Sequence, residues 1–285
     1  MSENVIAKEA PHRVAYVAPA RRPVGLLLRV LITKLRPLWV IGAIVVLWEL
    51  FASSGFFPPV ILPKFSEVMQ TMYAASVSGE LFLAIAWSCY RVLLGFFIGL
   101  ALGFPLGLAI GWSRIIHELV NPVVEVLRPV PPLAWIPLAV IWFGVGFKSV
   151  MFITVMGSLF PITLAVISGV HSVDKHVIEY ARTLGASTNQ ILRHVVIPAA
   201  LPGAFVGMRI AIGFSWMVVV AAEMISVKYG LGWMIWKARF SLDTDTVIAG
   251  MITIGALSMI MTKGMLTIEK RLFRWREYLV KGKGS

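Results

Sequence analysis

Long runs of residues without a charged side chain are the feature that most restricts what this chain can fold into. Four runs of 22, 19, 25 and 17 residues lie between Arg91 and Arg114, Arg128 and Lys148, Lys148 and Asp174, and Asp245 and Lys263. A helix needs about 20 apolar residues to cross a bilayer. Two further apolar stretches, residues 37–56 and 199–225, contain three charges, Glu49, Arg209 and Glu223. The sequence therefore predicts an all-α, polytopic membrane protein with about six transmembrane helices.

Composition agrees with this class. Hydrophobic residues make up 58% of the chain and charged residues 14%, whereas soluble domains are typically about 25% charged. Residues 1–20 are mixed in polarity and precede a basic run, so they are not expected to be a cleavable signal peptide. Cys89 is the one cysteine, and it excludes an internal disulfide.

The net charge of +12 could suggest nucleic-acid binding, but its distribution favours a membrane protein without a nucleic-acid partner. Seven Lys and Arg residues lie in residues 1–36, seven in 263–285 and three in the polar segment, which we define as residues 171–198. Basic loops remain cytoplasmic. We therefore expect cytoplasmic tails at 1–36 and 271–285 and a cytoplasmic polar segment, in a bacterial inner membrane protein. Residues 37–80 should hold the first transmembrane helix and an outer connection.

The polar segment reads as two short helices joined at a glycine. Asp174 is placed to cap the first helix, and Gly185 suits its left-handed end. Ser187 and Gln190 form a capping box for the second helix, which Pro198 should limit. Three apolar residues of the first helix fall on one face: Val177, Ala181 and Leu184.

This elbow resembles the EAA loop of permease subunits of ATP-binding-cassette importers. Glu179, Ala181 and Gly185 match the loop in register. Val195 occupies its aliphatic position, and Ile197-Pro198 occupies its Leu-Pro position. Tyr180 departs from the pattern, which has an alanine there. The resemblance implies docking of a cytoplasmic ATPase dimer through Glu179, Tyr180, Ala181, Gly185, Ala186 and Ser187. An ordinary cytoplasmic helical hairpin is the alternative interpretation.

The segment from Arg128 to Gly146 is similar to permeases for taurine, other sulfonates and nitrate, and the resemblance extends over about residues 81–270. It implies a type I importer fold, a homodimer, and an extracytoplasmic solute-binding protein. ATP and Mg would bind the partner ATPase, and this chain would carry no cofactor or metal. No Walker A sequence occurs in the chain, so ATP hydrolysis is expected on a separate subunit.

Two patterns predict how the spans pack. Glycine recurs at every fourth position from residue 95 to 111, a stripe that lets membrane helices approach closely and that could also permit sliding. The helix-packing residues are Gly95, Gly99, Gly103, Gly107 and Gly111. Four prolines in residues 129–137 should break or kink the third span, which makes Arg128 and Trp135 candidates for the transport pathway.

Arg209 and Glu223 are further pathway candidates, because charges within a span are rare and often functional. Fourteen residues separate them, about 21 Å along a helix and within about 40° of one face. Each should therefore find a partner on another helix or face a wet cavity, and both should face one seam. The two arginines, Arg128 and Arg209, suit a small anion, with taurine or an alkanesulfonate favoured and nitrate, bicarbonate or a vitamin precursor as alternatives.

A secondary transporter or channel is the competing class. It would need coupling carboxylates near the bilayer centre, and Glu223 and Glu49 are the available candidates. The spacing of His171, His176 and His194 matches no zinc pattern. Trp233, Trp236 and Phe240 are typical of an interfacial aromatic belt.

Overall fold

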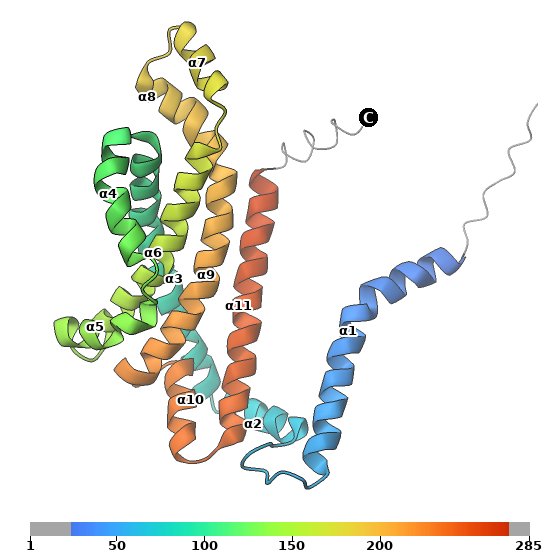
Figure 1. The fold of residues 1–285 in the computed structure, drawn as a ribbon. Coiled ribbons are helices and arrows are strands. Elements are labelled where there is room, and N and C mark those ends of the chain that lie inside the picture. The colour runs from blue at the N-terminus through green and yellow to red at the C-terminus, as the bar shows by residue number, and fades with distance from the viewer. Residues whose placement is uncertain (1–23, 274–285) are drawn as a thin grey trace, which may run out of the picture. The chain divides into compact units, whose positions relative to one another are not determined.

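A computed structural model describes residues 24–273, with side chains from residue 39 onward, and every regular element in this range is helical (Figure 1). The basic segments 1–23 and 274–285 lie outside the described residues. The chain forms two units, one ending at Phe51 and one beginning at Ala52. Helix α1 (Val24–Ser53) makes up the described part of the first unit. It begins within the stretch assigned from sequence to the tail.

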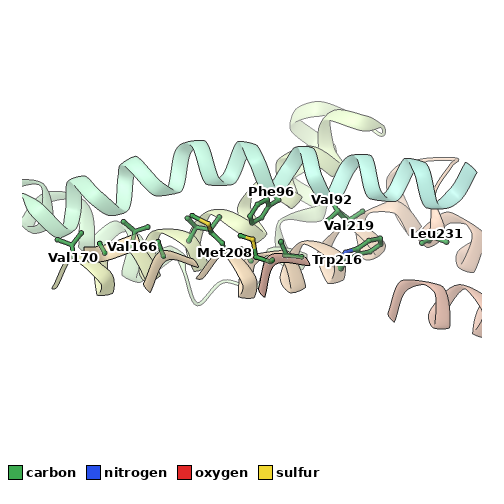
Figure 2. Close-up of a cluster of buried hydrophobic side chains, with 14 of the residues drawn as sticks. Val92, Phe96, Val166, Val170, Met208, Trp216, Val219 and Leu231 are labelled. Carbon is green, nitrogen blue, oxygen red and sulfur yellow. The ribbon is translucent and has the colours of Figure 1, made fainter. Parts of the chain in front are cut away.

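Three long helices form the core of the second unit: α3 (Glu80–Trp112), α6 (Phe147–His171) and α9 (Ile197–Ser226). Their apolar side chains interlock along the length of the bundle (Figure 2). Phe96 of α3 and Trp216 of α9 are 3% and 2% exposed. These three helices connect the two ends of the second unit, at which the shorter elements lie.

Small residues bring the core helices together. All five glycines of the stripe on α3 face α6, where Thr154, Ser158, Thr163, Val166 and Val170 occupy the space that a side chain would need. The Ser158 hydroxyl donates to the Gly95 carbonyl (3.2 Å). On the other side of α6, a Cβ on Gly169 would lie 2.7 Å from the Ala200 carbonyl oxygen of α9. The backbones therefore touch at both contacts of α6.

The proline-rich segment is broken, as predicted. Helix α4 (Arg114–Leu127) ends before it, a 3₁₀ turn η1 (Pro132–Trp135) follows, and α5 (Ile136–Phe143) continues at an angle of 86° to α4. Pro131 has no N–H to donate, and the prolines at 129 and 132 restrict the residues before them, so a continuous helix cannot form here.

The remaining elements lie at the two ends of the second unit (Figure 1). One end carries the polar segment, with α7 (Lys175–Thr183), α8 (Thr188–Ile191) and the π turn η2 (Leu192–Val196). The opposite end, called here the α10 end, carries α10 (Leu231–Phe240), the start of α11 (Thr244–Leu272) and α2 (Phe65–Val77).

The predicted count of six spans is not confirmed. Among residues 39–273, four helices are long and apolar enough to cross a membrane, and the bent pair α4 and η1–α5 would make a fifth. The part of α1 with described side chains, Trp39–Ser53, is a shorter apolar helix. The four long spans extend beyond the charge-free runs, because helices such as α9 include the charges that interrupt the sequence pattern.

Candidate functional site

The polar segment forms the elbow expected from its capping residues. The His176 N–H donates to the Asp174 carboxylate (2.9 Å) at the start of α7. Gly185 has φ +84° and ends it in the left-handed conformation. Ser187 and Gln190 complete the capping box, with the Ser187 N–H donating to the Gln190 side chain (2.8 Å) and the Gln190 N–H donating to the Ser187 hydroxyl (3.4 Å). Local hydrogen bonds thus define the geometry of the turn.

The apolar residues of α7 do not all pack against the core. Ile178 and Ala181 pack against the core, whereas Val177 and Leu184 are 47% and 87% exposed. Two apolar stripes share Ala181 in the sequence, and periodicity alone does not say which of them meets the core. The outward face therefore carries Tyr180, 68% exposed, next to Leu184 one helical turn on.

A shallow cavity of about 420 Å³ adjoins this elbow. It lies between the end of α3, at Trp112, and the charged side of α7, with Lys175, Glu179 and Arg182 in its wall. Acidic and basic groups thus lie on one side of the exposed apolar pair formed by Tyr180 and Leu184. A surface that combines exposed apolar and charged side chains is suited to binding another protein.

The prediction that Pro198 ends the second helix is wrong. The chain continues from Thr188 to Ser226 as one apolar span, with the π turn η2 at its elbow end, where the Ile197 N–H donates to the Leu192 carbonyl. Pro198 lies in the first turn of α9, directly after the π turn, and it has no N–H to continue the hydrogen bonds of the helix. The wider turn therefore carries the helix past the proline, and such turns are frequent at functional sites.

Glu223 lies at the α10 end in a buried network. Its carboxylate pairs with Arg91 of α3 (2.5 Å) and accepts from the Ser88 hydroxyl (2.8 Å) and the Gly232 N–H (3.0 Å). Glu223 is fully buried and Arg91 is 4% exposed. Arg91 also donates to the Tyr229 carbonyl (2.7 Å). The network joins α3 and α9 to the turn before α10.

The glycines of this turn are required by the same network. A Cβ on Gly230 would lie 2.5 Å from the Glu223 carboxyl carbon, and one on Gly232 would lie 2.8 Å from the Glu223 Cβ. Sequence analysis did not single out Ser88 or Arg91. One feature of the sequence could have identified Arg91: it lies at the edge of a long apolar run, where its charge needs a counter-ion within the protein.

Arg209 lies near the middle of the same long helix and faces α11. Its guanidinium is 3.6 Å from the Glu269 carboxylate, and the two side chains are 32% and 21% exposed. Both charged residues of α9 thus find partners on other helices, as predicted. The prediction that they face one seam is wrong, because Glu223 meets α3 and Arg209 meets α11; the 40° offset between them is enough to select different neighbours.

The other two pathway candidates lie around the break in the proline-rich segment. Arg128 is exposed at the C-terminal end of α4 and forms no ion pair among the side chains of residues 39–273. Trp135 is half-buried in η1, with its ring in edge contact with Phe152 of α6. No hydrogen bond or ion pair within the described side chains joins either residue to Arg209 or Glu223.

Together these features define a helical membrane protein with a capped elbow at one end of its core. Residues 99–274 match the family of binding-protein-dependent transport system inner membrane components, and the chain belongs to this family. It is a multi-pass inner membrane protein and a non-catalytic transporter subunit.

Three relatives illustrate the relationship. A putative ABC transporter permease protein, MJ0413 of Methanocaldococcus jannaschii, is 41% identical over 82% of this chain and 90% of its own. The putative aliphatic sulfonates transport permease protein SsuC of Escherichia coli is 37% identical, covering 85% and 92%. The taurine transport system permease protein TauC of Escherichia coli is 35% identical, covering 82% and 88%. Sequence similarity thus spans most of both chains in each case.

The fold is shared with a solved transporter. A chain of the MetNI methionine ABC transporter, crystallised in inward-facing conformations, superposes with a TM-score of 0.59. The match covers 67% of this chain and 96% of the other at 19% sequence identity. This confirms the type I importer permease fold.

Proposed function

We propose that this chain is the permease subunit of an ATP-binding-cassette importer and forms the pathway for a small anion. Two copies would assemble with two cytoplasmic ATPase subunits, which bind ATP and Mg, and with an extracytoplasmic solute-binding protein. Both termini and the polar segment would face the cytoplasm. Family membership and the distribution of basic residues support this arrangement.

One observation supports the proposed contact between the elbow and the ATPase: two large apolar side chains are exposed on an elbow whose helix ends are capped by local hydrogen bonds. Tyr180 and Leu184 project from α7 and are 68% and 87% exposed. Large exposed apolar side chains with a charged rim are a feature of protein interfaces. We assign the contact with the ATPase to the segment from Glu179 to Ser187. Within this segment, Ala181 and Ala186 pack against the core.

The elbow could transmit nucleotide binding to the spans because it is continuous with α9. ATP-driven closure of the ATPase dimer would favour the conformation in which the elbows lie closer together. Nucleotide then shifts the inward/outward equilibrium through its differential affinity for the two states. Solute released by the binding protein would enter the outward-open pathway, and hydrolysis would reset it.

A small anion, most simply an alkanesulfonate such as taurine, is the proposed solute. Two of the relatives are named for aliphatic sulfonate and taurine transport. Arg128 and Arg209 supply guanidinium groups, whose fork geometry matches sulfonate oxygens. Contacts in a pathway must remain weak enough for release. The competing secondary transporter has less support, because the Glu223 carboxylate is fully buried and paired with Arg91.

Substitution at Gly185 tests the coupling role. A Cβ at Gly185 meets no atom within 4 Å, so Gly185→Val acts through the backbone, where φ is +84°. Holding a β-branched residue in that conformation costs about 1–3 kcal/mol. We expect the variant to insert in the membrane but to lose co-purification with its ATPase and to lose uptake in proteoliposomes.

Gly79→Val is the matched control, because Gly79 has φ +81° in the left-handed region and also has open space around it but lies directly before α3. It should still co-purify with the ATPase. If Gly185→Val assembled and transported like the wild type, the docking role would be withdrawn.

The solute class has a separate test. The partner binding protein is screened by thermal shift against taurine, alkanesulfonates, nitrate, bicarbonate and neutral or cationic vitamins. Stabilisation by a sulfonate is expected. Stabilisation by a cationic thiamine precursor alone would overturn the anion assignment and leave the permease assignment intact.

A further inference from the structure

Within residues 39–273, the ion pairs Arg91–Glu223 and Arg209–Glu269 join long helices, and the two pairs differ in kind. The pair of Arg91 and Glu223 is buried, close and surrounded by further donors. The Arg209–Glu269 pair is partly exposed, and its nearest N–O distance of 3.6 Å is too long for a hydrogen bond. The first pair is built to stay closed, whereas the second is only loosely held.

The carboxylate of Glu269 is incompletely satisfied. Its Oε2 atom is buried and accepts no hydrogen bond from any described residue. The Arg209 guanidinium is its ion-pair partner within the described side chains. A buried carboxylate oxygen without a hydrogen bond is costly, so Glu269 depends on Arg209, while Arg209 retains donors that Glu269 does not engage.

A cavity opens next to this pair. It holds about 390 Å³ and is lined by Arg209, Ile210, Gly213, Phe214 and Met217 of α9 and by Thr262 of α11. Thr262 lies two helical turns before Glu269 and therefore on the same side of α11. The cavity is shallow and open, and its mostly apolar lining includes one guanidinium and one hydroxyl. This combination suits an organic anion with a small apolar part.

From this geometry we propose that Glu269 acts as an internal substitute for the transported anion: it occupies Arg209 when the cavity is empty, and the anion displaces it when the cavity is filled. The inference rests on the proposed function, in which the solute is a small anion. Glu269 sets the affinity of the site in this scheme, because it neutralises Arg209 and so weakens anion binding. A weak site releases its solute, as a transport pathway requires.

The test measures anion binding to the purified permease–ATPase complex without its binding protein, so that the affinity of the binding protein does not enter. Methanesulfonate is the probe, and the uncharged dimethyl sulfone, of nearly the same shape, is its control, both at constant ionic strength. Binding is followed as the concentration dependence of the thermal unfolding temperature. The variants are Glu269→Gln, Arg209→Gln and Arg209→Lys, with Glu118→Gln as the matched control in an exposed ion pair with Arg114.

Methanesulfonate should stabilise the wild type saturably, and dimethyl sulfone should not. Removing the competing carboxylate in Glu269→Gln should lower the half-saturating concentration about fivefold, the change expected when a part-exposed pair worth about 1 kcal/mol no longer competes. Arg209→Gln should abolish saturation and Arg209→Lys should retain part of it, whereas Glu118→Gln should bind like the wild type. A purely structural Glu269 would instead lower the unfolding temperature without changing the half-saturating concentration.

Two results would overturn the inference. One is equal methanesulfonate binding by the wild type, Glu269→Gln and Arg209→Gln, which would leave the proposed function untouched. The other is the lack of binding even in Glu269→Gln. In that case the permease function is tested separately on the same preparations. The two measurements are co-purification with the ATPase and solute uptake in the presence of the binding protein.

Discussion

The buried pair of Arg91 and Glu223 gives the sharpest quantitative prediction for stability. In Arg91→Met the Glu223 carboxylate remains fully buried without its counter-ion, and breaking such a pair typically costs about 3–5 kcal/mol. Glu223→Gln likewise leaves the buried Arg91 guanidinium without its counter-ion, although Arg91 still donates a hydrogen bond to the Tyr229 carbonyl. In the double variant both charges are gone, so its cost should be about 2 kcal/mol or more below the sum of the single variants.

Reversible unfolding of the purified protein in bicelles measures these free energies, and the double-mutant cycle gives the coupling between the two side chains. Arg114→Met is the control, because Arg114 pairs with Glu118 while its side chain is 92% exposed; it should change stability by less than about 1 kcal/mol. Neutral hydrogen bonds between membrane helices average about 0.6 kcal/mol in such cycles. A coupling at or below that value would refute the view that this pair locks the α10 end.

Two further predictions concern packing and topology. Gly99→Ala places a methyl group against a hydroxyl of α6 and should destabilise the protein by about 1–3 kcal/mol, whereas Gly255→Ala on α11, with nothing within 4 Å, should be neutral or stabilising in the same unfolding assay. In a Cys89→Ser background, a cysteine at Ser241 should react with an impermeant thiol reagent in intact cells and one at Ser187 should not; equal labelling would overturn the topology.

Features set by neighbouring residues were predictable from the sequence. Asp174, Gly185 and the Ser187–Gln190 box act within a few residues of each other, so their spacing defines their geometry. The break between α4 and α5 was equally local, because prolines act on the adjacent backbone. These elements needed no knowledge of the packed structure.

Features that depend on which helices meet were not predictable in the same way. The sequence shows that Arg209 and Glu223 need partners, but the partners, Glu269 and Arg91, lie 60 and 132 residues away along the chain. Which of the two apolar stripes on α7 packs likewise depends on the folded core. The path of the chain past Pro198 required a π turn, for which the sequence carries no distinct pattern.

The continuity of the helix from Thr188 to Ser226 has a mechanical consequence. At about 1.5 Å per residue, Thr188 lies about 52 Å from Glu223 along this rod. With the Glu223 end fixed by its network, a tilt of about 5° moves the Thr188 end by about 4.5 Å. The same tilt moves Arg209, about 21 Å from the fulcrum, by about 1.8 Å, half of the 3.6 Å that separates it from Glu269. A displacement of a few Å at the elbow therefore produces a smaller displacement at Arg209, one that is large enough to open or close its ion pair with Glu269.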